Sequence, residues 1–294
     1  MHTKSHSDGN LVAAFIRLLE GDKSLNSGFL SSAMVAASLS PKFGFRAGQV
    51  GGTLSGRTIM YNELSLLFSD ITIETATKRE YWAAIIDRNV LSKKTLASRK
   101  ESARRLTNLY GLDPAIPLFR LLKIFWRFDP KAHPLLAILC ACGREPLLRA
   151  SVAPILSIQI GDIAEKSAIG SAIDDYSKGT FSQSTLNSII RNILSSWTQS
   201  GHLIGKSNKV RSHPVSNSVA TTYALALGYL SGARGEMLFS TLWANILDQP
   251  VHTLMTHAQE ASRRGWITFR NVGNIIDVDF STLFTEKEKR LVNE

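Results

Sequence analysis

Apolar residues recur at helical spacing through most of the chain from residue 57 onward, and no other sequence feature constrains the fold as strongly. The spacing predicts helices over 59–68, 77–89, 94–110, 115–128 and 133–142, then helical turns over 147–160 that Pro154 interrupts. Gly111 follows the third helix and is suited to end it, because glycine readily adopts the left-handed conformation of a C-terminal cap. We therefore expect a mainly α, multi-helical protein.

From residue 176 onward the pattern combines helices with short strands. An amphipathic helix is expected over 183–200, a short strand over 202–205, a polar basic loop over 206–217 and a buried helix over 218–230. Helices over about 236–247 and 251–264 follow, and the alternating segments 266–270 and 275–280 flank an Asn-Val-Gly-Asn turn typical of a hairpin. This order predicts helix-turn-helix or winged-helix elements and a small C-terminal β-hairpin.

Three domains are expected on this basis. Residues 1–56 are interpreted as an N-terminal extension, with a short amphipathic helix over 11–19 and a stretch rich in glycine and serine. Residues 57–175 are expected to form a helical domain that contains a basic helix-turn-helix-like segment, and residues 176–294 a winged-helix-like domain.

Hydropathy favours a protein of the cytoplasm without a membrane span. The longest apolar run from residue 20 onward, 219–230, is well short of the roughly 20 residues that a span requires. The two cysteines, Cys140 and Cys142, are separated by one residue in an apolar run, so we interpret them as buried, reduced side chains.

Charge indicates the kind of partner. The chain has 34 Lys and Arg against 24 Asp and Glu, a formal net charge of +10, which favours a polyanion, either nucleic acid or an acidic membrane surface. The alternative is a soluble protein that is basic without consequence. The cations are unevenly distributed along the sequence, however, and this favours a binding role.

The C-terminal unit provides one group of candidate DNA contacts. In a winged helix-turn-helix module the second helix enters the major groove and the hairpin contacts the flanking backbone. Here Arg263, Arg264 and Arg270 provide cations, and Gln259 and His257 are candidates for contacts with bases or phosphates. The alternative is a helical layer closed by a hairpin without a ligand, or a protein-docking module.

Two further basic groups lie earlier in the chain. The loop over 206–217 contains Lys206, Lys209, Arg211 and His213, and no Asp or Glu occurs between residues 176 and 235. Between residues 78 and 105 nine basic residues oppose three acidic ones; the candidates here are Lys93, Lys94, Arg99, Lys100, Arg104 and Arg105. An apolar stripe including Leu96 is expected to face inward and leave the basic face outward. The alternative for both groups is an ordinary solvated surface.

Catalysis finds little support in the sequence. No local Ser/His/Asp or Cys/His grouping, no phosphate-binding glycine loop and no metal-ligand pattern stands out. We expect a non-enzymatic protein without a cofactor or a bound metal.

The order of motifs resembles a known family. Residues 86–91, IDRNVL, followed by Lys94-Thr95, Ser98-Arg99 and Arg104-Arg105-Leu106, resemble the signature of the BrxA family, small accessory proteins of BREX bacteriophage-exclusion systems. Residues 191–203 are similar to a later helix-and-glycine segment of that family. The resemblance implies an all-helical protein with winged-helix features that binds double-stranded DNA alongside BREX components such as the methyltransferase, without enzymatic activity.

Three functions follow as hypotheses. The preferred one is a non-catalytic, mainly phosphate-directed double-stranded DNA-binding accessory protein of a BREX-type phage-defence system. The alternatives are a sequence-specific winged-helix transcriptional regulator and a protein-interaction scaffold within a defence complex. The preferred hypothesis requires that cations from distant stretches gather on a common side and are not neutralised by carboxylates.

Overall fold

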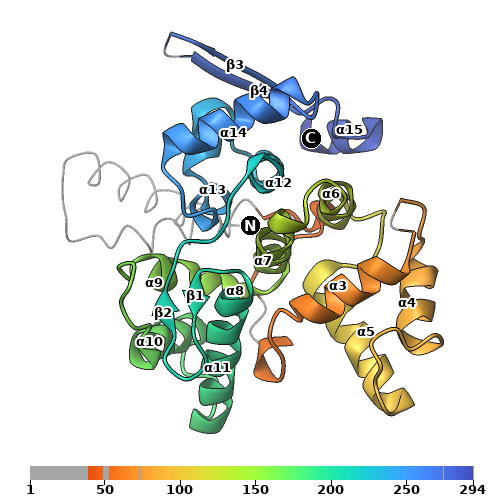
Figure 1. Ribbon diagram of the computed structural model, residues 1–294, viewed down its shortest axis with the longest axis vertical. Helices are drawn as coiled ribbons and strands as arrows, with labels where there is room; N and C mark the ends of the chain where they lie inside the picture. The colour runs from red at the N-terminus through yellow and green to blue at the C-terminus, as the bar shows by residue number, and fades with distance from the viewer. Residues whose placement is uncertain (1–38, 49–52, 73, 274, 294) are drawn as a thin grey trace, which may run out of the picture. The chain divides into compact units, whose positions relative to one another are not determined.

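Two buried helices, α7 (His133–Arg144) and α12 (Ser218–Leu230), occupy the centre of the structure (Figure 1). The computed structural model describes residues 39–48, 53–72, 74–273 and 275–293. Every residue of α12 except Tyr229 is buried, as expected for a helix that is apolar on all sides. The Tyr223 hydroxyl donates to the Leu118 carbonyl at 3.1 Å, so this buried polar group is hydrogen-bonded.

The described residues are mainly helical, as the apolar spacing predicts. A first group of helices comprises α3 (Tyr61–Asp70), α4 (Lys78–Ile86), α5 (Leu96–Tyr110) and α6 (Pro117–Trp126). Thr77 and Glu80 form a capping box at the start of α4, and Thr95 caps α5 through the Ser98 backbone amide. Gly111 ends α5 at a φ of 98°, the conformation for which glycine is suited.

A second group surrounds a small hairpin. It comprises α8 (Pro146–Ala150), α9 (Val152–Leu156), α10 (Lys166–Ser177), α11 (Gln183–Gln199), β1 (Leu203–Ile204) and β2 (Val210–Arg211). β1 and β2 pair antiparallel, and Ile163 forms a further antiparallel bridge to Val210. The break expected at Pro154 lies instead at Ser151, because Pro154 stands in the first turn of α9, where no helical N–H is needed.

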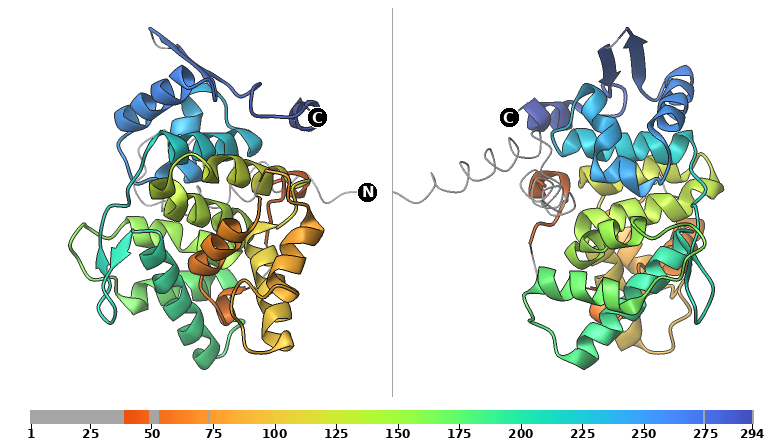
Figure 2. Two further views of the ribbon diagram at one scale, coloured as in Figure 1. Left: turned by 45° about the vertical axis from the view of Figure 1, so that its right-hand side comes forward. Right: turned by 90° about the vertical axis from the view of Figure 1, so that its left-hand side faces the viewer.

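The third group ends in a longer hairpin. It comprises η4 (Gly235–Ser240), α13 (Leu242–Ile246), α14 (Val251–Arg263), β3 (Thr268–Val272), β4 (Ile275–Asp279) and α15 (Glu286–Asn293). The prediction of a single helix over 236–247 is wrong, because the 3₁₀ helix η4 ends at Ser240 and a separate helix, α13, begins at Leu242. Thr241 caps α13: its hydroxyl accepts from the Ala244 amide. β3 and β4 extend away from the helices in both views of Figure 2.

The structure differs from the expected domain boundaries. Residues 1–38, with the helix expected over 11–19, lie outside the described residues, but part of the expected extension packs into the core. Phe43 and Phe45 are buried, and Phe45 stacks on Trp243 with ring centroids 5.5 Å apart. The boundary expected at residue 176 falls inside α10, which packs on α11. The described residues accordingly form one compact unit.

The helices of the described ranges do not include a membrane-spanning one. Crossing a bilayer requires a long and continuously apolar helix, and none of them combines the two properties.

The C-terminal helix, which the apolar spacing does not predict, is held to α6 by a nearly buried ion pair. The Arg120 guanidinium donates from Nε to Glu288 at 2.7 Å and also to the Leu283 carbonyl, and the Glu288 side chain is 6% exposed. Replacing Arg120 with methionine leaves this carboxylate buried without its cation. We expect the free energy of unfolding to fall by about 3 kcal/mol in urea denaturation.

Lys289→Met is the matched control on the same helix. Lys289 pairs with Glu286, whose side chain is 79% exposed, so its loss is expected to cost less than about 1 kcal/mol. Equal losses in the two variants would contradict a structural role for the Arg120–Glu288 pair.

Candidate nucleic-acid interface

Helix α11 presents a polar face to solvent. Its apolar stripe, which includes Ile189, Ile193 and Trp197, is buried against the rest of the protein. The opposite face is exposed at Gln183, Ser184, Asn187 and Arg191 and contains no carboxylate. These residues are not among the sequence-predicted contacts, although they occupy the helical positions that the apolar stripe leaves free. This face presents amide, hydroxyl and guanidinium groups together.

The loop between β1 and β2 lies next to this helix, and β1 contacts α11 (Figure 1). Gly205 adopts a φ of 98°, and a Cβ there would lie 2.2 Å from the Asn208 carbonyl oxygen, so this tight loop requires glycine. The Lys206 side chain is exposed, whereas Lys209 donates to the Gly205 carbonyl at 3.1 Å. Partial burial lowers the pKa of Lys209. Lys206 is therefore the more accessible cation of the loop.

Arg211 and His213, two of the predicted DNA contacts, bond to the same carboxylate, that of Asp248. Arg211 is 2% exposed, and its guanidinium pairs with Asp248 at 2.8 Å and donates to the His202 carbonyl at 3.2 Å. The Asp248 carboxylate also accepts a hydrogen bond from His213 Nδ1 at 2.9 Å, and the His213 side chain is 58% exposed. We therefore correct the predicted DNA contact of Arg211: burial and its ion pair give the side chain a structural role.

The predicted cations of α14 and β3 are only partly available. Arg263 is exposed and forms no ion pair within the described part of the chain. Arg264 pairs with Glu260 at 2.6 Å and lies over the Trp266 ring, and Arg270 stands opposite Asp277 in the strand register. Arg264 is therefore compensated by a carboxylate, whereas Arg270 is exposed and forms no ion pair among the described residues.

The two uncharged candidates on α14 differ in exposure. His257 is half-buried, and its Nδ1 hydrogen-bonds with the Thr221 hydroxyl at 3.0 Å, so one of its two ring nitrogens is already engaged within the protein. Gln259 is exposed and stands one helical turn before Arg263 on the same face.

Most of the predicted cations around α5 are held by neighbours. Lys93 pairs with Glu63 at 3.1 Å, Arg104 and Arg105 both pair with Glu101, and Arg99 donates to the Lys93 and Ile86 carbonyls. Lys94 and Lys100 are exposed and form no ion pair among the described residues. Leu96, expected in the buried stripe, is instead 53% exposed at the first position of the helix.

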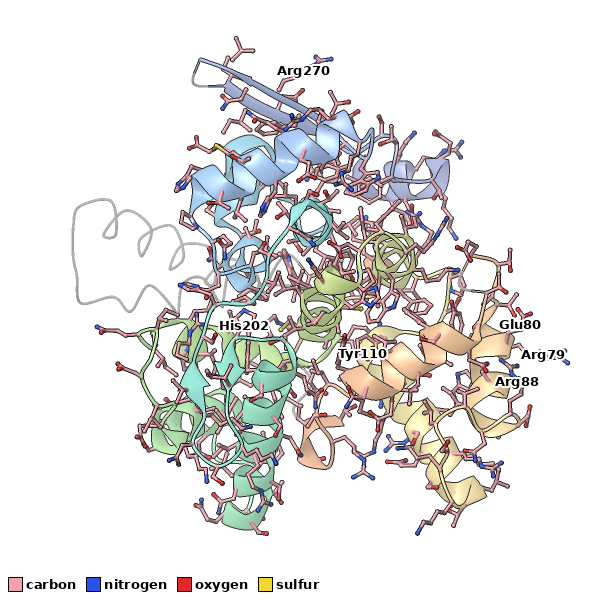
Figure 3. The ribbon with its side chains drawn as sticks, in the orientation of Figure 1. Arg79, Glu80, Arg88, Tyr110, His202 and Arg270 are labelled. Carbon is pink, nitrogen blue, oxygen red and sulfur yellow. The ribbon has the colours of Figure 1, made fainter. Side chains whose placement is uncertain are left out.

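The three basic groups do not form one continuous patch. The short helix η2 (Thr53–Ser55) contacts both α5 and α11, and Arg105 and Asn192 each donate to its backbone carbonyls. Helices α5 and α11 therefore both lie next to η2, whereas Arg270 lies on the hairpin at the opposite end of the view in Figure 3. The requirement that the cations of all three groups share one side is not met, so a duplex contact has to rest on the narrower arrangement of α11 and the β1–β2 loop alone.

Comparisons of the chain with models of known protein families, with curated proteins and with solved structures found no match. Within the described ranges, no group of three or more His, Cys, Asp or Glu side chains is placed to hold a metal ion. Cys140 and Cys142 are buried free thiols, and burial raises the pKa of Cys140 to about 12.

His202 supports the α11 region from inside. Its ring is buried, its Nε2 donates to the Ile246 carbonyl at 2.7 Å, and its Nδ1 hydrogen-bonds with the Ser200 hydroxyl at 2.8 Å. Burial lowers the pKa of His202 from 6.5 to about 4, so the folded protein holds this ring neutral.

We expect this burial to make stability depend on pH. Because the folded-state pKa lies below the unfolded value, the contribution of His202 is complete above pH 6.5 and is lost as the pH falls toward 4. The gap in unfolding free energy between the wild type and His202→Asn should narrow by about 3 kcal/mol between about pH 8 and pH 4 in urea titrations. A gap that stays constant over this range contradicts the assignment, and exposed His252→Asn serves as the control.

Proposed function

We propose that the chain is a non-catalytic double-stranded DNA-binding protein and that α11 with the β1–β2 loop is its main duplex contact. The observation that carries the proposal is the order α10, α11, β1 and β2, with the bridge from Ile163 adding a third strand position. This is the order of a winged helix, in which the second helix of the pair enters the major groove and the hairpin lies on the flanking backbone.

The chemistry of the exposed side chains supports a contact directed mainly at phosphates. Arg191 and Lys206 provide cations, and Ser184 and Asn187 provide short polar groups for directed hydrogen bonds. No carboxylate occurs anywhere between residues 176 and 235, so nothing in that segment repels the backbone of a duplex.

The biological setting of the proposal rests on the resemblance to the BrxA family. We propose that the protein is an accessory factor of a BREX-type phage-defence system in the cytoplasm, working alongside components such as the methyltransferase. The residues that carry the resemblance include Thr95, Ser98 and Arg99, which stand at the start of α5 after a short turn from α4. A scaffold that recruits other defence proteins without touching DNA is the competing function.

The double substitution Arg191→Glu/Lys206→Glu tests duplex binding directly. We expect affinity for a random duplex to fall by about tenfold or more at low salt, because two attractions to phosphates become repulsions. The slope of log K against log[salt] should become shallower by about 1 for each phosphate that is no longer neutralised. Fluorescence anisotropy over a salt series measures both quantities.

Lys287→Glu is the matched control for this variant. Lys287 is exposed on α15, away from α11 in sequence and structure, and changes the net charge in the same direction. Absence of duplex binding by the wild type, or equal reductions in affinity per charge in both variants, would reject the proposed contact and favour the scaffold.

A second candidate, the sequence-specific regulator, is favoured by the side chains that accompany the cations. Asn187 on α11 and Gln259 on α14 are exposed amides, and such amides bond bidentately to adenine in the major groove. Base reading by Asn187 would appear as a preferred sequence in selection from a random duplex pool.

Under that second candidate, Asn187→Ala should relax the preference at one base position by about 1–3 kcal/mol and leave the salt slope unchanged. Binding that shows no preferred sequence in the wild type contradicts the regulator and leaves phosphate-directed binding in place. Thr198→Ala, on the same helix, is the control because the Thr198 hydroxyl donates to the Leu194 carbonyl of its own helix at 2.9 Å.

A further inference from the structure

The tip of the β3–β4 hairpin exposes two large apolar side chains. Val272 is 76% exposed and Ile275 is 74% exposed, the highest values among the exposed large hydrophobic residues of the described chain. The two residues are direct partners in the strand register, so their side chains lie together on one face of the hairpin. Large apolar side chains are usually buried, so an exposed pair at the end of a projecting hairpin indicates a contact with another molecule.

The base of the hairpin, in contrast, is firmly anchored. Val278 is buried, Phe269 packs edge-on against Phe239 with ring centroids 6.0 Å apart, and the Phe269 amide donates to the Ser262 hydroxyl of α14 at 3.2 Å. The apolar tip is therefore carried in a set position relative to α14. Both views of Figure 2 show this hairpin extending beyond the helices.

The two hairpins of the protein differ in the chemistry of their tips. The β1–β2 loop carries Lys206, Ser207 and Asn208, groups suited to phosphates. At the β3–β4 tip the nearest charges, Arg270 and Asp277, have opposite signs and stand opposite each other in the strand register, without an ion pair between them. The second tip thus presents apolar surface with little net charge, which suits the stacked bases of a duplex better than its backbone.

The small size of the apolar tip favours a ligand that needs only a small contact. A stable protein–protein contact buries about 800 Å² on each partner, far more than two side chains provide. An apolar wedge between two base pairs needs only one or two such side chains, which partly unstack the step and kink the duplex by about 20–90°.

We propose that Val272 and Ile275 form a wedge that enters the minor groove between adjacent base pairs and bends the duplex. The inference rests on the proposed duplex binding and adds a second contact with a different chemistry. Polar side chains on the exposed face of α14, including Gln259 and Arg263, lie at the foot of the same hairpin. In the proposed complex they contact the duplex next to the wedged step. The bend brings more of this unit against the duplex.

The test measures bending and binding separately on the full chain. A duplex of about 30 base pairs labelled at both ends reports bending by energy transfer, with either a central TA step or a stiff A-tract. Wild type is expected to bend the TA duplex and to prefer it over the A-tract by about three- to tenfold, because the flexible step unstacks more easily. Val272→Ser/Ile275→Ser should abolish the bend and the preference while leaving the salt slope unchanged, since neither side chain neutralises a phosphate.

Val215→Ser is the matched control. Val215 is 64% exposed and lies outside both hairpins, so its substitution should leave the bend intact. Wild-type binding without a bend, or a bend that survives the double substitution, overturns the wedge and leaves the duplex-binding proposal standing. Failure of the wild type to bind any duplex overturns both.

Discussion

Complete burial of α12 is the constraint on which the rest of the structure depends. A helix with only Tyr229 outside the core needs neighbours on every side, and α6, α7, α13 and α14 supply them. The first and third helical groups are joined through this packing, although the sequence between them is long. The apparent domain boundary at residue 176 therefore has no counterpart in the core: burial of the central helices requires both halves of the chain.

Electrostatics inside this unit explains why net charge alone misleads. The stretch from 176 to 235 contains no carboxylate, yet Arg211 is neutralised by Asp248, which comes from the turn before α14. Similarly, Glu101 on α5 pairs with both Arg104 and Arg105. The cations left for a ligand are fewer than the formal charge suggests. Arg191, Lys206, Lys94 and Lys100 are among the exposed cations that pair with no acidic side chain in the described structure.

Local chemistry made much of the helical fold predictable. Caps such as Thr77 and Gly111 and the apolar stripe of α11 place helices to within a few residues, because each signal acts within one or two turns. The failures have nonlocal causes. Helix α10 has a weak apolar stripe, and it is held by packing against α11. Burial of Arg211 depends on a partner 37 positions later, which no local pattern reveals.

The candidate site also shows what the sequence can and cannot predict. Spacing that identifies the buried stripe of α11 also identifies its exposed face, so Asn187 and Arg191 were within reach of the sequence once the helix was recognised. Selecting residues by charge favoured Arg211 over Asn187, although accessibility decides which side chain meets a ligand.

The apolar pair at the β3–β4 tip is exposed although its residue types are those of a buried strand. Val272 and Ile275 resemble ordinary strand residues in sequence, and only their position beyond the anchored base of the hairpin distinguishes them from core. In the proposed function, the uncharged pair at the projecting tip contacts the bases of a duplex and the cationic loop contacts its backbone, so the two surfaces act by separate physical means.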